Sequence, residues 1–281
     1  MNSTLAKLSA AMAITRPINA LITGLSVAIA VILARPIVDF RPVIFALVSA
    51  MILASAGNVI NDWYDYEIDR VNRPQRVLPA GRLSRRFAAR FAIILFVCGF
   101  FFSIFINKFA VLIAGASVLL LITYSAKLKR TVLWGNLAVS FMTGLAFVYG
   151  ALAAGRWEAG VIPGIFAFLF HFGREILKDL EDVPGDAALA AVTLPIRYGP
   201  RVTRVAITLV YGLLIVSTFV PYALRIYGGL YLAVVLPGVD VVLATLVALL
   251  WIRGEKANLR LYSQILKADM LVGLFAIYLG K

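Results

Sequence analysis

The stretch PVIFALVSAMILASAGNVINDWYDYEID (residues 42–69) joins a long apolar segment to three aspartates, Asp62, Asp65 and Asp69. About 20 apolar residues are what a helix needs to cross the hydrocarbon core of a bilayer. Similar apolar segments recur along the chain, 62% of which is hydrophobic. Because only helices and closed barrels satisfy their backbone hydrogen bonds inside a membrane, this composition predicts an all-α polytopic membrane protein.

We expect nine membrane-spanning helices around a central cavity. The apolar segments cover roughly residues 15–34, 42–62, 87–106, 109–126, 134–154, 161–180, 202–221, 229–252 and 264–280. The N-terminus and the loops after the even-numbered segments carry 21 of the 27 Lys and Arg residues. The positive-inside rule therefore predicts a cytoplasmic N-terminus and a multi-pass protein of the cell membrane. We find no linker, so we expect a single domain over residues 1–281.

A second trio of aspartates has the same spacing: Asp179, Asp182 and Asp186 in REILKDLEDVPGD (residues 174–186). The two clusters hold six of only 14 acidic residues. On a helix, positions i, i+3 and i+7 share one face, where like charges repel unless a cation lies between them. Mg²⁺ prefers oxygen ligands and commonly bridges carboxylates to phosphates. Two such acidic faces opposite each other would form a site for Mg²⁺ and a diphosphate.

Polar residues around the clusters are candidates for substrate binding. They are Asn58, Asn61, Arg70, Arg73, Arg76, Tyr124, Lys127, Lys129, Arg130, Arg174 and Lys178. An amide oxygen of Asn58 or Asn61 could also ligate the metal, while Arg and Lys suit phosphate oxygens. The sequence leaves open whether Lys127 or Lys129 reaches the diphosphate. Plain ion pairs at helix ends and a basic cytoplasmic loop are the competing, purely structural interpretation.

The rest of the composition excludes several classes of site and partner. One cysteine and one histidine exclude an intramolecular disulfide and a multi-histidine metal centre. A net charge of +13 could indicate nucleic acid. In a membrane protein, however, it is more typical of basic cytoplasmic loops facing anionic lipids or phosphates. We therefore expect membrane lipids, and no nucleic acid, as partners.

Residues 61–84 (NDWYDYEIDRVNRPQRVLPAGRLS) and 174–199 (REILKDLEDVPGDAALAAVTLPIRYG) resemble the two signature regions of the UbiA superfamily of intramembrane prenyltransferases. The resemblance implies nine helices, Mg²⁺ on both aspartate motifs, an isoprenyl diphosphate between them and a lipophilic acceptor. Within the superfamily the chain is most similar to digeranylgeranylglyceryl phosphate synthases. These enzymes join geranylgeranyl diphosphate to geranylgeranylglyceryl phosphate in ether-lipid biosynthesis, and the resemblance implies the same reaction. The positive-inside rule places both acidic clusters, and so the expected site, on the cytoplasmic side.

Two other functions are kept open. The first changes the acceptor to an aromatic ring or a tetrapyrrole, as in quinone, chlorophyll or haem pathways. For a glycerol-phosphate acceptor, the phosphate would need basic residues, with Arg73, Arg76, Arg82 and Lys129 as candidates. The second is an ion-coupled secondary transporter, because intramembrane acids often mark ion pathways. Transporters place such groups near the midplane, whereas these clusters end their segments, which favours the enzyme.

Overall fold

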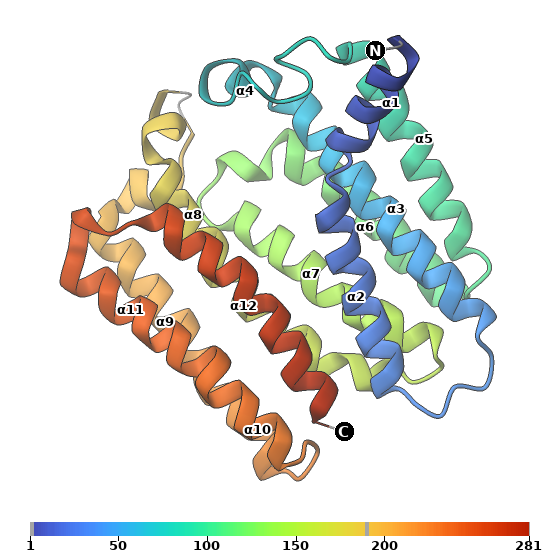
Figure 1. Cartoon of the computed structure of the whole chain (residues 1–281), viewed down its shortest axis with the longest axis vertical. Coiled ribbons are helices and arrows are strands. Elements are labelled where there is room, and N and C mark those ends of the chain that lie inside the picture. Colours follow the sequence, from blue (N-terminus) through green and yellow to red (C-terminus); the bar gives the residue numbers. More distant parts are fainter. Residues whose placement is uncertain (1–2, 189–190, 281) are drawn as a thin grey trace. The chain divides into compact units, whose positions relative to one another are not determined.

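The computed structural model describes residues 3–188 and 191–280, and within these ranges it contains helices and no strand (Figure 1). The chain divides into two compact units. Unit 1 runs up to Lys129 and also includes Val148–Glu158, and unit 2 comprises Arg130–Phe147 and the chain from Ala159 onward. The helix α7 (Trp134–Ala153) therefore contributes residues to both units.

Unit 1 is built around the long helix α3. Its helices are α1 (Ser3–Ile14), α2 (Pro17–Leu33), α3 (Arg41–Tyr64), α4 (Tyr66–Asn72), α5 (Arg85–Ser103) and α6 (Lys108–Ala126). The helix α3 packs against α2, α5 and α6 (Figure 1). The buried Ser49 hydroxyl of α3 lies 2.7 Å from the Gly99 carbonyl oxygen and 2.9 Å from the Tyr149 hydroxyl. Small residues and hydroxyl bonds of this kind are typical of packed membrane helices, which approach closely.

Unit 2 contains the second long acidic helix. Its elements after α7 are α8 (Val161–Ala188), α9 (Leu194–Ala223), α10 (Gly229–Val235), a π-helical turn η3 (Leu236–Asp240), α11 (Val241–Arg253) and α12 (Leu259–Leu279). The helix α8 packs against α9 and α12, and α9 also packs against α11. Gly173 of α8 lies so close to Tyr211 of α9 that a Cβ atom there would overlap the tyrosine ring.

Eight helices of the described chain are long and apolar enough to cross a membrane. A ninth span is reached if Leu5–Ile14 and Pro17–Leu33, bent by 49°, count as one. Large apolar side chains are exposed on these helices, for example Leu119 at 69% and Leu209 at 68%, as expected for surfaces that face lipid. The predicted all-α, multi-pass membrane fold is confirmed, with up to nine spans.

The helices extend beyond some of the predicted apolar segments, most clearly at the end of the sixth segment and the start of the seventh. The sixth apolar segment was expected to end at residue 180, but α8 continues through Pro184 to Ala188 and so carries its aspartates on one helix. The seventh was expected to begin at residue 202, but α9 begins at Leu194. Its backbone is non-helical at Gly199, with φ 83°, a region that glycine adopts without a steric penalty. The apolar pattern resumes only after this bend, which explains the late predicted start.

Candidate functional site

The first aspartate cluster lies where α3 passes into α4. Asp62 is in the last turn of α3, Asp65 lies between the helices, and Asp69 is in α4. The helical hydrogen-bond pattern continues across the junction, since the Asp65 N–H donates to the Asn61 carbonyl (2.9 Å) and the Asp69 N–H to the Asp65 carbonyl (2.8 Å). All three side chains are buried. The spacing therefore keeps the three carboxylates on one face, as predicted.

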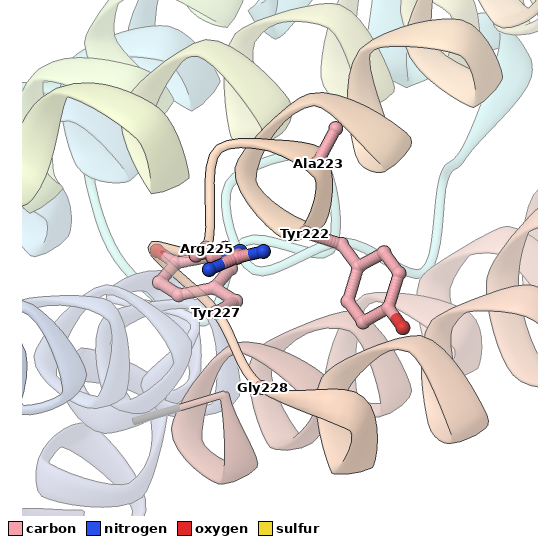
Figure 2. Close-up of a pocket in the computed structure, with 5 residues that line it drawn as sticks. All are labelled: Tyr222, Ala223, Arg225, Tyr227 and Gly228. Atoms are coloured by element: carbon pink, nitrogen blue, oxygen red, sulfur yellow. The ribbon is translucent and has the colours of Figure 1, made fainter.

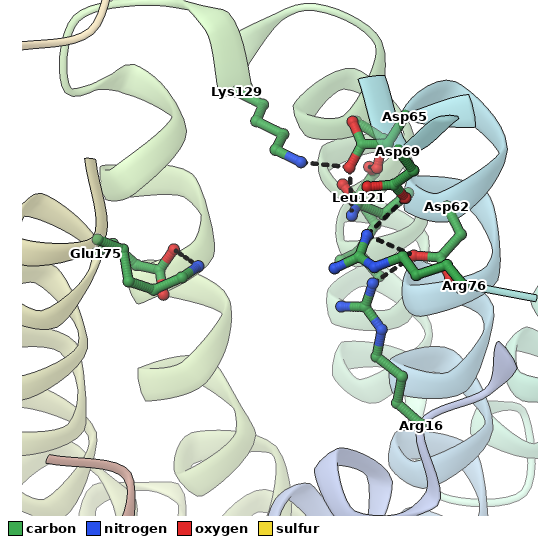
Figure 3. A network of polar contacts seen from close by, with 11 residues as sticks. Arg16, Asp62, Asp65, Asp69, Arg76, Leu121, Lys129 and Glu175 are labelled. Atoms are coloured by element: carbon green, nitrogen blue, oxygen red, sulfur yellow. Dashed lines mark hydrogen bonds and ion pairs between the residues drawn. The ribbon is translucent and has the colours of Figure 1, made fainter. Parts of the chain in front are cut away.

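Three cations from separate parts of unit 1 contact these carboxylates (Figure 3). Arg16, just before α2, pairs with Asp62, and Lys129 pairs with Asp65. Arg76, in the loop after α4, lies 2.6 Å from Asp69 and 3.5 Å from Asp62. A buried carboxylate without a partner is costly, so these cations stabilise the cluster. With three carboxylates and three cations, the cluster is formally neutral.

The two asparagines beside this cluster differ in what they contact. The Asn61 amide nitrogen donates to Asp65 Oδ2 at 3.0 Å, while its Oδ1 is buried without a hydrogen-bond partner in the described structure. The Asn58 amide nitrogen donates instead to the Thr15 carbonyl oxygen at 3.0 Å. Asn61 thus offers an unused oxygen next to a carboxylate, and Asn58 ties α3 to the turn between α1 and α2.

The residues of the first cluster fit a metal that is shared with a substrate. Among residues 3–188 and 191–280, no group of three or more His, Cys, Asp or Glu side chains is arranged to hold a metal ion. Mg²⁺, however, usually takes only one or two protein carboxylates, together with water and substrate phosphates. The carboxylate of Asp65 and the unpartnered Oδ1 of Asn61 are hard oxygen donors of that kind. The geometry therefore suits Mg²⁺ bound with a phosphate, rather than a closed protein cage.

The second aspartate cluster lies on one helix, α8, in unit 2. Asp179 accepts a hydrogen bond of 2.8 Å from the amide of Asn136, a buried residue in the first turn of α7. Asp182 and Asp186 follow on the same helix and are half-buried. This arrangement matches the predicted common face of positions i, i+3 and i+7.

The cations next to the second cluster gather on Glu175. Arg174 lies 3.1 Å and Lys178 3.2 Å from the Glu175 carboxylate, and His171 Nε2 lies 3.9 Å from it. The side chain of Glu175 is only 12% exposed. The two cations therefore pair with a glutamate one helical turn before Asp179, which is the pairing that the purely structural interpretation anticipated for this segment.

The other predicted substrate-binding residues are more exposed. Arg70 lies 3.2 Å from Glu67, and both side chains are more than half exposed. Lys129 contacts the first cluster, whereas Lys127 is exposed. Three further predicted residues are exposed or half-buried: Arg73, Tyr124 and Arg130.

Sequence reasoning missed Arg16 and Asn136. Arg16 and Asn136 are polar residues at the start of apolar segments, and that is the one local signal they carry. Each contacts an aspartate more than 40 residues away, at Asp62 and Asp179 respectively. Only the folded chain brings such pairs together.

A separate surface pocket of about 430 Å³ lies at the connection between α9 and α10 (Figure 2). It is lined by Tyr222, Ala223, Arg225, Tyr227 and Gly228. None of the six aspartates lines it. Its one charged side chain makes it a poor candidate for metal-diphosphate chemistry, and the clusters remain the candidate site.

Comparison with known proteins adds independent information. The profile of the UbiA prenyltransferase family matches residues 20–271. The chain is 38% identical to the digeranylgeranylglyceryl phosphate synthase of Methanothermobacter thermautotrophicus over 271 residues, 95% of this chain and 94% of the relative. It is 40% identical to the enzyme of that name from Methanopyrus kandleri over 266 residues, 94% and 96% of the two chains.

Solved structures agree with the sequence relatives. A structure of digeranylgeranylglyceryl phosphate synthase superposes with a TM-score of 0.81 at 31% identity and covers 98% of both chains. A UbiA homologue from Archaeoglobus fulgidus, solved with DMAPP and Mg²⁺, has a TM-score of 0.66 at 18% identity and covers 95% of this chain and 98% of its own. The second likeness concerns the fold alone.

Proposed function

This chain belongs to the UbiA prenyltransferase family, and we propose that it transfers a geranylgeranyl group from its diphosphate to the hydroxyl of geranylgeranylglyceryl phosphate. The observation that carries this proposal is the similarity of the chain to digeranylgeranylglyceryl phosphate synthases over 94–95% of its length, together with its two aspartate motifs. Mg²⁺ is the cofactor. The partners are an isoprenyl diphosphate, the lipophilic acceptor and the surrounding membrane lipids.

The reaction breaks the bond between the allylic C1 atom and the diphosphate oxygen. The acceptor hydroxyl oxygen forms a new ether bond to C1, and its proton is released together with the diphosphate, which leaves with the electron pair of the broken bond. Negative charge grows on the leaving diphosphate, and bound Mg²⁺ neutralises part of it. Each aspartate cluster would supply carboxylate ligands for Mg²⁺, and Asn61 would add an amide oxygen in the first cluster. An apolar helical environment keeps water from the reactive carbon.

The paired cations of unit 1 have a second use in this scheme. Arg76 and Lys129 balance buried carboxylates in the structure described above. If those carboxylates ligated Mg²⁺, the Arg76 guanidinium and Lys129 ammonium groups would become available to the phosphate oxygens. Arg offers a bidentate fork and Lys a point charge for this purpose. The leaving group then meets both cations where its charge develops.

We also propose that the site faces the cytoplasm of the cell membrane and that residues 1–281 act as a single catalytic domain. The orientation is supported by the bias of 21 among 27 basic residues toward one set of loops. The single domain is supported by the match of one family profile to residues 20–271. Protease or thiol-labelling accessibility of engineered loop cysteines in intact vesicles would test the orientation.

The deciding experiment is an assay in liposomes with Mg²⁺ and geranylgeranyl diphosphate. Geranylgeranylglyceryl phosphate and 4-hydroxybenzoate are offered in parallel, and both lipid product and released diphosphate are measured. We expect a diether product that disappears with EDTA. Product on the aromatic acceptor alone would contradict the glycerol-lipid acceptor, and no diphosphate release with either acceptor would favour a transporter.

A further inference from the structure

A cluster of hydrogen-bond donors lies in unit 2, one helical turn before the second aspartate motif. Arg174 and Lys178 share one carboxylate, that of Glu175, at 3.1 and 3.2 Å. The Arg174 Nε atom is buried and has no hydrogen-bond partner among the described residues. Two cations thus face a single acid, with donor capacity left over. Such an excess of donors suits an anionic ligand.

Tyr211 of α9 adds a neutral donor to this cluster. Its side chain is 1% exposed, and its ring packs against the bare backbone of Gly173, next to Arg174. Its hydroxyl has no hydrogen-bond partner within the described structure, yet it lies within electrostatic range of Arg174 and Glu175. A buried hydroxyl without a partner is costly, which indicates that a bound group can complete it.

Other polar groups face the same region. Asp269 of α12 also lies within electrostatic range of the Tyr211 hydroxyl, and its Oδ2 is buried without a partner in the described chain. His171 Nδ1 is buried and unpartnered as well, while its Nε2 faces Glu175. Asp269 adds an acid on α12, but both cations, Arg174 and Lys178, lie on α8 beside Glu175.

We propose that this cluster binds the phosphate of the glycerol-phosphate acceptor, an inference that rests on the proposed function. Three cations of unit 1 already pair with the aspartates of the first cluster, and the proposed function assigns Arg76 and Lys129 to the diphosphate. Arg174 and Lys178 form their ion pairs with Glu175, whereas Asp179 accepts a hydrogen bond from the Asn136 amide and has Lys178 within electrostatic range. Both cations can therefore serve a second phosphoryl group, and Arg is well suited to bind one in a bidentate manner.

The position along α8 fits the chemistry of that acceptor. Glu175 and Asp179 are four residues apart, about one helical turn or roughly 5–6 Å of rise. In a glycerol phosphate, the reacting hydroxyl is at most two carbon atoms from the carbon that bears the phosphate. A phosphate held at Arg174 would thus keep the hydroxyl close to the aspartate motif, while the acceptor's prenyl chain extends into apolar surroundings.

The test compares the KM values of both substrates in Arg174→Gln and Tyr211→Phe. Losing a hydrogen bond to a charged group weakens binding by about 10- to 100-fold, so we expect the acceptor KM to rise about 30-fold in Arg174→Gln. In Tyr211→Phe we expect a rise of about fivefold. The donor KM should stay within about twofold in both. With geranylgeranylglycerol, which lacks the phosphate, variants and wild type should have equal KM values.

The matched control is Tyr231→Phe, which removes a buried hydroxyl of unit 2 that donates to the Thr218 carbonyl at 2.9 Å. It should leave both KM values unchanged. A rise in donor KM in the two test variants would overturn the assignment in favour of a diphosphate role. An equal penalty with the phosphate-free acceptor would reduce the cluster to a structural one. Wild-type protein inactive on the phosphorylated acceptor would overturn the proposed function itself, before any variant is compared.

Discussion

The two aspartate clusters have the same sequence spacing but different surroundings. In unit 1, Asp62, Asp65 and Asp69 are buried across a junction of two helices and contact cations from distant segments. In unit 2, the aspartates follow one continuous helix, where Asp179 accepts from a neutral amide. The nearby cations there bind Glu175 instead.

This difference shows that equal spacing does not give equal electrostatics. The first cluster is formally neutral with its three cations, so a metal must displace or redirect them. In the second cluster, Asp179 accepts a hydrogen bond from a neutral amide, and the neighbouring Arg174 and Lys178 pair with Glu175, so Asp179 is held differently from the aspartates of the first cluster. We infer that the clusters contribute differently to metal affinity although both are needed for turnover.

The largest expected effect comes from removing one carboxylate in either cluster. Asp62→Asn and Asp179→Asn keep the side-chain shape but remove a metal ligand and its charge. Because electrostatic stabilisation of a leaving group is commonly the largest catalytic term, we expect kcat to fall about 10³-fold or more in each. Steady-state turnover with saturating Mg²⁺ measures this.

The matched controls are Glu67→Gln and Glu181→Gln, acids that lie beside the clusters without belonging to the spaced trio. Both should retain most of the wild-type kcat. If one cluster variant kept more than about a tenth of wild-type turnover, the claim that both clusters serve the same reaction would be wrong.

A smaller effect is expected on the free energy of unfolding when a cation of the first cluster is removed. Arg76 bridges Asp62 and Asp69, so Arg76→Gln leaves two buried carboxylates with less compensation. Allowing for the 21% exposure of Arg76, we expect a loss of about 2 kcal/mol, or a thermal midpoint about 5 °C lower in detergent without metal. Mg²⁺ should restore much of this loss, because it takes the same carboxylates.

The control for that measurement is Arg70→Gln. Arg70 forms an exposed pair with Glu67 at 3.2 Å, and exposed pairs contribute about 0–1 kcal/mol. The thermal midpoint of Arg70→Gln should stay close to that of the wild type, both with and without Mg²⁺. An Arg76 variant whose midpoint ignores Mg²⁺ would show that the cation and the metal do not compete for these aspartates.

Much of the fold followed from local sequence pattern. Apolar length predicted the spans of both units, and the i, i+3, i+7 spacing predicted the common face of each cluster. The pattern failed at Gly199, where the left-handed backbone bends α9 within one helix. Helix boundaries near such bends depend on tertiary packing, which apolar periodicity does not encode.

The candidate site was predicted less completely, because its pairings are long-range. Eleven flanking residues looked equally suitable by type and position. The sequence separation is 46 residues for Arg16 and Asp62 and 64 for Lys129 and Asp65. No local rule selects such partners, and the same applies to the amide that holds Asp179. The sequence predicted which residue types could bind metal and phosphate, whereas the fold was needed to show which cation or amide contacts which aspartate.

The smallest expected effect concerns the two lysines that the sequence could not rank. Lys129 contacts Asp65 in the first cluster, while Lys127 is exposed two residues earlier. Lys129→Gln should raise the KM for geranylgeranyl diphosphate about tenfold, the value of one charge-assisted hydrogen bond, with Lys127→Gln as the matched control at less than about twofold. Initial rates over a range of diphosphate concentrations at saturating acceptor measure both. A larger rise in KM for Lys127→Gln than for Lys129→Gln would contradict this prediction. It would mean that Lys129 stays paired with Asp65 when substrate binds, and that the exposed Lys127 contacts the diphosphate.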